Sequence, residues 1–139
     1  MNRSVKTLLL LALTAMLSLS AAQAAEPEPQ PGDTLPYRVY FPIARQISPG
    51  AIGTYQICDV AEYLQRHPAV KVDVLGYADA GTGTLEENTD LAGQRATIVV
   101  GSLASMGINS DRLNIVNKAA SEQLFRMNER NRVVIFVVR

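Results

Sequence analysis

The segment 72–100 constrains the fold more than any other part of the chain. It reads VDVLGYADAGTGTLEENTDLAGQRATIVV: an apolar strand runs to Asp79, a loop of glycine and threonine follows, and a helix then carries Arg95. An anionic and a cationic side chain therefore fall at neighbouring ends of a strand and a helix. A carboxylate can hold an ammonium group, and a guanidinium group can hold a carboxylate through two parallel hydrogen bonds. The pattern favours binding of a zwitterionic ligand over catalysis.

Apolar periodicity predicts four strands and two helices. The strand segments alternate or are β-branched, and the helix segments repeat apolar residues at i, i+3, i+4 and i+7. Ser48 and Pro49 begin the first helix as N-cap and first helical residue, and Pro68 ends it. The segment 118–130 is polar and irregular, with room for one helical turn. The predicted strands cover 37–41, 70–76, 113–117 and 132–138, and the second helix covers 89–106.

The order β-α-β-α-β-β predicts an α+β fold. This fold is a two-layer sandwich in which two helices pack on one face of a mixed four-stranded sheet, because right-handed crossovers put both helices on the same side. The near-continuous apolar run at 132–138 predicts a strand that is covered on both faces or lies centrally. The residues expected in the core are Ile57, Val60, Leu64, Leu91, Val99, Leu103, Val133 and Ile135.

These segments resemble the OmpA-like domain, the peptidoglycan-binding module of Gram-negative envelopes. The family pattern is approximately G-H-T-D, a loop, and then N-x-x-L-S-x-x-R-A-x-x-V-x-x-x-L-x-x-x-G-I. The resemblance extends over residues 37–139 and implies the same two-layer fold. The matching residues in this chain are Gly76 and Asp79, then Asn88, Leu91, Arg95, Ala96, Val99, Leu103, Gly107 and Ile108.

The resemblance also implies a function and a site. The chain would bind peptidoglycan non-covalently, without a reaction or a cofactor, by recognising diaminopimelate in the stem peptide. Arg95 would hold the carboxylate of this diamino acid and Asp79 its ammonium group, while Asn88 and Arg132 would lie beside the ligand. Other interpretations stay open. Asp79 could be a turn residue, Arg95 could pair with Asp79 or Glu87, and Asn88 could be the helix N-cap, which the sequence favours.

The chain departs from the family pattern at several positions. Tyr77 and Ala78 replace the His and Thr of the tetrapeptide, and Asn131 stands where the family has the middle basic residue before its last strand. The loop after the first strand, 42–45, reads Pro-Ile-Ala-Arg instead of carrying an Asp. These changes predict the loss of contacts at the edge of the site. An alternative function is therefore a protein-interaction module of the outer membrane or periplasm that no longer binds the wall.

The first 24 residues have the pattern of a signal peptide. Arg3 and Lys6 precede an apolar run at 7–18, and Ala22-Gln23-Ala24 is an A-x-A cleavage site. We expect export to the periplasm, followed by a Pro-rich, acidic linker at 25–36 and the OmpA-like domain at 37–139. The linker or an exposed sheet edge could contact an outer-membrane protein and thereby associate the domain with that membrane.

Composition and missing motifs disfavour several other functions. Thirteen basic side chains become eleven once the signal peptide is removed, against 13 acidic ones, and the chain has no Trp and no basic tract, so nucleic-acid binding is disfavoured. His67 has no cluster of metal ligands around it in sequence, and no catalytic motif is visible. Cys58 is the single cysteine; we expect a partly buried thiol, with an intermolecular disulfide as the alternative.

Overall fold

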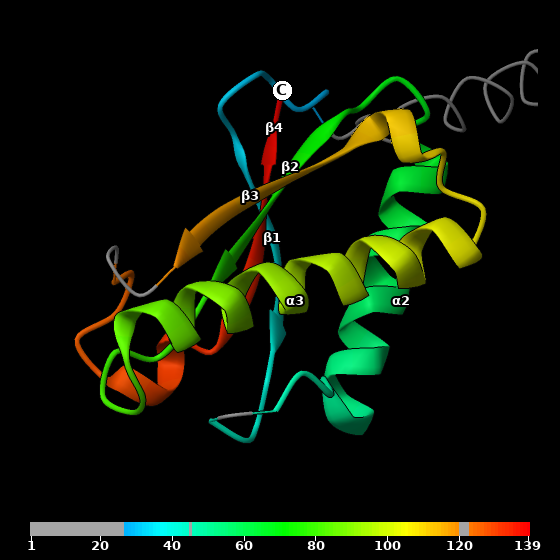
Figure 1. Cartoon of the computed structure of the whole chain (residues 1–139). Helices are drawn as coiled ribbons and strands as arrows, with labels where there is room; N and C mark the ends of the chain where they lie inside the picture. The colour runs from blue at the N-terminus through cyan, green and yellow to red at the C-terminus, as the bar shows by residue number, and fades with distance from the viewer. Residues whose placement is uncertain (1–26, 45, 120–122) are drawn as a thin grey trace, which may run out of the picture.

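The computed structural model describes residues 27–44, 46–119 and 123–139. Within them the chain forms the expected order of strands and helices, with two short 3-10 helices added (Figure 1). The strands are β1 Thr34–Tyr40, β2 Val72–Tyr77, β3 Leu113–Ala119 and β4 Val133–Val138. The helices are α2 Gly50–Arg66, α3 Leu85–Ser105, η1 Ser110–Arg112 and η2 Asn128–Asn131. The predicted signal peptide lies outside the described residues.

The four strands form one mixed sheet in the order β1-β4-β2-β3. β2 and β3 are parallel, whereas β4 runs antiparallel to both of its neighbours. Val74 of β2 lies opposite Phe136 of β4 on one side and Ile115 of β3 on the other. β4 therefore lies inside the sheet, and five of its six residues are buried, as its continuous apolar sequence predicts.

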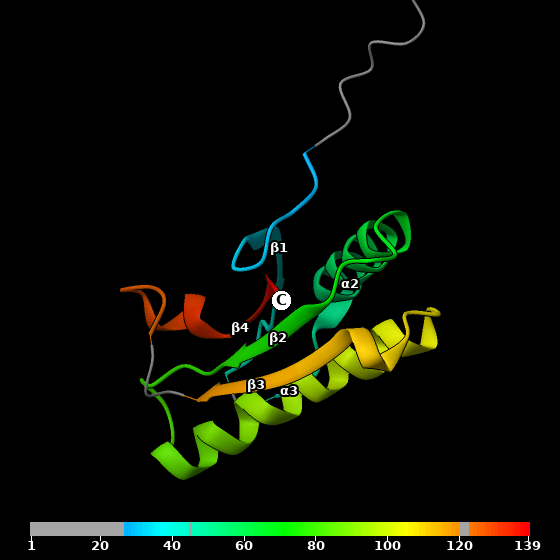
Figure 2. The same ribbon diagram turned by 90° about the horizontal axis from the view of Figure 1, so that it is seen from above.

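Both helices cover the same face of the sheet, with α3 against β2 and β3 and α2 against β1 (Figure 2). Gly76 is where β2 and α3 come closest. A Cβ atom built on Gly76 would lie 2.2 Å from the carbonyl oxygen of Ala92, so only glycine allows this approach. The contact fixes the end of β2, and the loop that follows it, against the first half of α3.

Apolar side chains fill the space between the helices and the sheet. Seven of the eight residues expected in the core are buried, and Leu91 is the exception. Leu91 is only partly buried because it lines a cleft between α3 and residues 46–48. A second, smaller cluster lies on the face of the sheet without helices. It consists of Leu75, Tyr77, Val133 and Ile135, with Phe125 packed against it.

The structure moves the starts of two elements by three or more residues. β1 begins at Thr34, three residues before its expected start, and Leu35 is 4% exposed, so the end of the predicted linker belongs to the sheet. α3 begins at Leu85 rather than at 89. The cause is a capping box, in which the Thr84 hydroxyl accepts from the Glu87 amide and the Glu87 carboxylate accepts from the Thr84 amide.

The start of α2 and the position of Cys58 also differ from the prediction. Pro49, not Ser48, occupies the N-cap position of α2, and it makes no side-chain cap bond; the Ser48 hydroxyl accepts from Gly50 at 3.3 Å. Cys58 is exposed, so the prediction of a partly buried thiol is wrong. The reason is helical geometry: the buried face of α2 passes through Ile57 and Val60, and position 58 turns to solvent. No helix in the described part of the chain is long and apolar enough to span a membrane.

We expect Leu103→Ala to destabilise the domain by about 2–5 kcal/mol, because Leu103 is completely buried between α3 and the sheet and truncation leaves a cavity. Chemical denaturation followed by circular dichroism measures this change. Ile52→Ala on α2 is the control, since Ile52 is 74% exposed and its truncation should change stability by less than about 0.5 kcal/mol. Equal losses for the two variants would contradict the packing described here.

Candidate functional site

Asp79 lies just beyond the end of β2 and is held by bonds to both of its oxygens. Its Oδ1 atom accepts from the amide of Gly81 at 2.6 Å, which makes a tight turn. Its Oδ2 atom accepts from Arg132, at 3.0 Å from Nη2 and 3.3 Å from Nε. The residue is 2% exposed. Asp79 is thus both a turn residue and one half of a buried ion pair.

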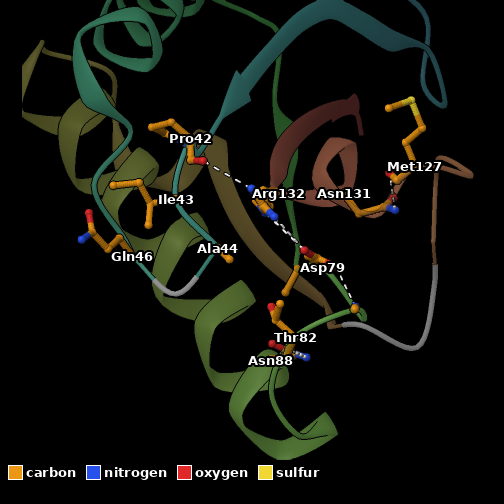
Figure 3. A network of polar contacts seen from close by, with 12 residues as sticks. Pro42, Ile43, Ala44, Gln46, Asp79, Thr82, Asn88, Met127, Asn131 and Arg132 are labelled. Atoms are coloured by element: carbon orange, nitrogen blue, oxygen red, sulfur yellow. Dashed lines mark hydrogen bonds and ion pairs between the residues drawn. The ribbon is translucent and has the colours of Figure 1, made fainter.

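Arg132 stands at the start of β4, on the side of the site opposite α3, and its side chain is 16% exposed. Figure 3 shows it between Pro42 and Asp79, and it also donates from Nη1 to the Pro42 carbonyl oxygen at 3.3 Å. One guanidinium group therefore joins the ends of β1, β2 and β4. This role as an ion-pair partner of Asp79 was not among the sequence expectations, which placed Arg132 only at the edge of a ligand site.

Asn131 positions Arg132 and is a residue that the sequence argument missed. It is completely buried, accepts from the Phe125 amide at 3.0 Å, and donates to the carbonyl oxygens of Phe125 at 2.9 Å and Met127 at 3.4 Å. These bonds close the loop before β4. From the sequence, Asn131 was interpreted as the loss of a basic residue. In the structure its buried amide group makes hydrogen bonds that a charged side chain could not make.

Arg95 comes from the middle of α3 and is completely buried. Its Nη2 atom donates to the carbonyl oxygens of Ile43, Ala44 and Gln46 at 3.0–3.1 Å, and its Nε atom donates to Gln46 at 3.2 Å. The centre of the guanidinium group lies 4.9 Å from the centroid of the Phe41 ring. The Nη1 atom is buried and has no hydrogen-bond partner among the residues that the structure describes.

The charges of Arg95, Arg132 and Asp79 influence one another. The pKa of Arg95 is lowered to about 10, first because burial disfavours the charged form and second because Arg132 is close; Asp79 opposes this shift. Arg95 is still charged at neutral pH. The carboxylate of Asp79 bonds to Arg132 and acts on Arg95 only through its charge. The three groups together keep one net positive charge, which suits an additional anionic group.

Asn88 is buried, and its side chain donates to the Thr82 carbonyl oxygen at 2.7 Å. It pins the loop between Asp79 and α3, as Figure 3 shows. The favoured interpretation of Asn88 as the helix N-cap is wrong, because Thr84 occupies that position. The alternative interpretation, in which Asn88 fixes the loop, agrees with this bond.

The four predicted site residues thus lie around one end of the sheet, but they are not equally connected. Asp79 and Arg132 are in direct contact, whereas Arg95 donates to the backbone carbonyl groups of Ile43, Ala44 and Gln46. A cleft of about 540 Å³ opens nearby and is lined by Asn88 but not by Asp79 or Arg95. Among the described residues, no group of three or more His, Cys, Asp or Glu side chains could hold a metal ion.

A two-layer sandwich with strand order β1-β4-β2-β3, and with an acidic residue after β2 facing basic residues from α3 and β4, defines the OmpA-like class of domains. The model of the OmpA family matches residues 46–134, and the chain belongs to this family. Outer membrane protein 40 of Porphyromonas gingivalis is 38% identical over 79 residues. The match covers 57% of this chain and 20% of that protein, so the chain corresponds to about a fifth of its relative's length.

Solved structures confirm the fold. The peptidoglycan-associated lipoprotein of Burkholderia pseudomallei is similar with a TM-score of 0.67 at 23% identity, over 74% of this chain and 90% of that one. The C-terminal domain of Helicobacter pylori MotB has a TM-score of 0.67 at 19% identity, over 73% and 83% of the two chains. The OmpA-like domain of FopA1 from Francisella tularensis has a TM-score of 0.65 at 17% identity, over 86% and 92%.

Replacing Asp79 by Asn should destabilise the domain by about 2–4 kcal/mol, since it leaves the guanidinium groups of Arg95 and Arg132 without the nearby carboxylate in a buried site. Thermal or denaturant unfolding gives the value. Asp59→Asn on the exposed side of α2 is the matched control and should change stability by less than about 0.5 kcal/mol. An Asp79→Asn variant as stable as the control would mean that the ion pair does not support the fold.

Asn131→Ala should cost about 2 kcal/mol or more, because the amide of Phe125 and two carbonyl groups lose their partner inside the protein. Hydrogen exchange at the Phe125 amide should speed up in this variant. In the control Asn114→Ala, an exposed bond to Asp73 is lost and stability should hardly change. Unchanged exchange at Phe125 would contradict the role given to Asn131.

Proposed function

We propose that this chain binds peptidoglycan non-covalently, by recognising the diamino acid of the stem peptide, with diaminopimelate as the ligand. Membership of the OmpA family supports the proposal, and one structural relative is named for its association with peptidoglycan. The observation that carries it is the Nη1 atom of Arg95, which is buried and has no hydrogen-bond partner within the described parts of the chain. An unpaired buried donor on a charged group is costly, so an anionic acceptor at this position would stabilise the site.

The arrangement of charges suits a zwitterion. Arg95 would donate from Nη1 to the ligand carboxylate, which the net positive charge of the cluster also attracts. Asp79 would accept from the ligand ammonium group, because a carboxylate has about four acceptor positions and only some are taken by Gly81 and Arg132. Asn88 and Arg132 would hold the surrounding loops in position rather than dominate the contact.

A ligand can bind only if it reaches the side chains of Asp79 and Arg95. Asp79 and Arg95 are almost completely covered, and the carbonyl groups of Ile43, Ala44 and Gln46 already occupy the Nη2 and Nε side of Arg95. The ligand would therefore exchange some of these bonds for its own. Such an exchange predicts modest affinity for one stem peptide, in the micromolar to millimolar range. Retention on the wall would then depend on rebinding to a polymer that repeats the same epitope.

A second candidate is an interaction module that keeps the fold without binding the wall. The internal bonding of Asp79, Arg132 and Arg95 favours it, because each of these charged groups is engaged by its own protein. Both candidates are binding functions. In either case we propose a place in the cell envelope, in the periplasm and close to the outer membrane, as the names of the relatives suggest.

Arg95→Lys tests the proposal, with Arg112→Lys as the matched control. Both arginines are tied to three backbone carbonyl groups, but Arg112 bonds to Leu64, His67 and Val70 at the far end of α2. Each variant should lose stability. In co-sedimentation with purified peptidoglycan, Arg95→Lys should bind at least about tenfold more weakly, because an ammonium group lacks the planar fork, while Arg112→Lys should bind like the wild type.

Free diaminopimelate completes the experiment. It should release the wild-type protein from the wall, and free lysine, which has one carboxylate fewer, should release it less well. Wild-type protein that stays in the supernatant at every concentration of peptidoglycan would overturn the proposal and leave the interaction module. Binding that diaminopimelate does not compete would retain the wall as partner and exclude the stem-peptide diamino acid.

A further inference from the structure

The loop before β4 carries an exposed surface that the site does not use. Between residues 123 and 130, Leu124 is 42% exposed and Met127 is 62% exposed, and Arg126 and Arg130 are exposed beside them. In Figure 3 the Met127 side chain points away from Asp79. Arginine and methionine are residue types enriched at protein–protein contacts. Glu129 is exposed as well, so the side chains of residues 124–130 carry one net positive charge. We call residues 124–130 the basic loop.

The basic loop is fixed rather than loosely attached. Its backbone is tied down by Asn131, and the Phe125 ring packs on the helix-free face of the sheet. Arg130 and Arg38 of β1 each lie 5.6 Å from the centroid of that ring. Within the described residues, the guanidinium groups of Arg38, Arg126 and Arg130 make no hydrogen bond or ion pair. The loop therefore presents unpaired positive charges on a prearranged surface.

A groove of about 940 Å³ on the outer side of α3 has the opposite charge. Its wall carries Glu86 and Asp90, one helical turn apart, and no Lys or Arg lines it. Its surface is mostly apolar and includes Leu85, which is 63% exposed, and Ile47, which is 38% exposed. Small residues at every fourth position of the helix form the floor of the groove and leave it open: Thr89, Gly93 and Thr97. We call this the α3 groove.

The two surfaces face different sides of the molecule. Figure 2 shows the loop that ends in η2 on one side of β2 and β3, and α3 on the other. The basic loop therefore cannot reach the α3 groove of its own chain. Both surfaces combine exposed apolar side chains with charge, and their charges are opposite. The two surfaces are therefore complementary, and they can contact each other only between two molecules.

We propose that the basic loop of one molecule docks in the α3 groove of a second copy. Arg126 and Arg130 would pair with Glu86 and Asp90, while Leu124 and Met127 would cover the apolar floor. The contact joins two different surfaces, so it is heterologous and repeats from one copy to the next. A second copy is favoured over another occupant because both halves of the contact, matched in charge and in apolar character, lie on the same chain.

Sedimentation velocity of the purified protein tests this inference. The weight-average mass should rise with protein concentration. The association should weaken about threefold to tenfold between low and high salt, because exposed charge pairs are screened. A protein that is monomeric at every concentration in low salt would overturn the proposal. Association that is insensitive to salt would also overturn it, because the charged residues would then not contribute.

Charge-reversal variants test whether the basic loop and the α3 groove form the contact. The loop variant is Arg126→Glu with Arg130→Glu, and the groove variant is Glu86→Lys with Asp90→Lys. Each should be monomeric by itself, and an equimolar mixture should associate again, because each variant supplies what the other lacks. Asp59→Lys with Arg66→Glu, on the exposed side of α2, is the control and should behave like the wild type. Unfolding curves establish that all variants are folded.

The mixing experiment distinguishes a contact between the basic loop and the α3 groove from other modes of association. If the mixture stays monomeric, or if only one of the two variants loses association, the basic loop does not meet the α3 groove and the inference is wrong. Wild-type protein that stays monomeric while a different protein binds its α3 groove would identify another occupant and would equally overturn the proposal. Wall binding is measured separately and does not enter this result.

Discussion

The buried guanidinium group of Arg95 is the interaction on which the functional end of this domain depends. A buried charge beside Phe41 is unfavourable unless its donors find acceptors, and here the backbone carbonyl groups of Ile43, Ala44 and Gln46 supply them. This requirement folds the segment after β1 against α3. Asp79 and Arg132 then add a second link, between the ends of β2 and β4, in the same electrostatic neighbourhood.

The fold could be predicted from the sequence because its signals are local and agree with one another. Alternating apolar residues marked the strands, and helical periodicity marked α2 and α3. The errors came from chemistry that periodicity does not contain. Thr84 and Glu87 begin α3 earlier through a reciprocal cap, and the Cys58 thiol turns to solvent one residue after a buried Ile57.

The grouping of the four charged and polar residues at one end of the sheet could be predicted, but the bonds between them could not. Asp79 and Arg95 were identified from a strand, a loop and a helix that are close in sequence. The partner of Asp79 is Arg132, 53 residues away, and it reaches Asp79 only because a buried Asn131 closes the preceding loop. Pairing of this kind depends on how an irregular loop folds, for which sequence periodicity has no signal. The burial of both charged groups likewise follows from tertiary packing.

Gly76 has a consequence for how this site can vary. Because β2 meets α3 there at backbone distance, even a methyl group would force the helix away from the sheet. Asp79 follows three residues along the strand, and Arg95 follows Ala92 by three residues on the helix. A shift at Gly76 would therefore change the separation of the two charges without touching either one. The spacing of the two charged side chains is a property of the scaffold, and it is kept only while residue 76 is a glycine.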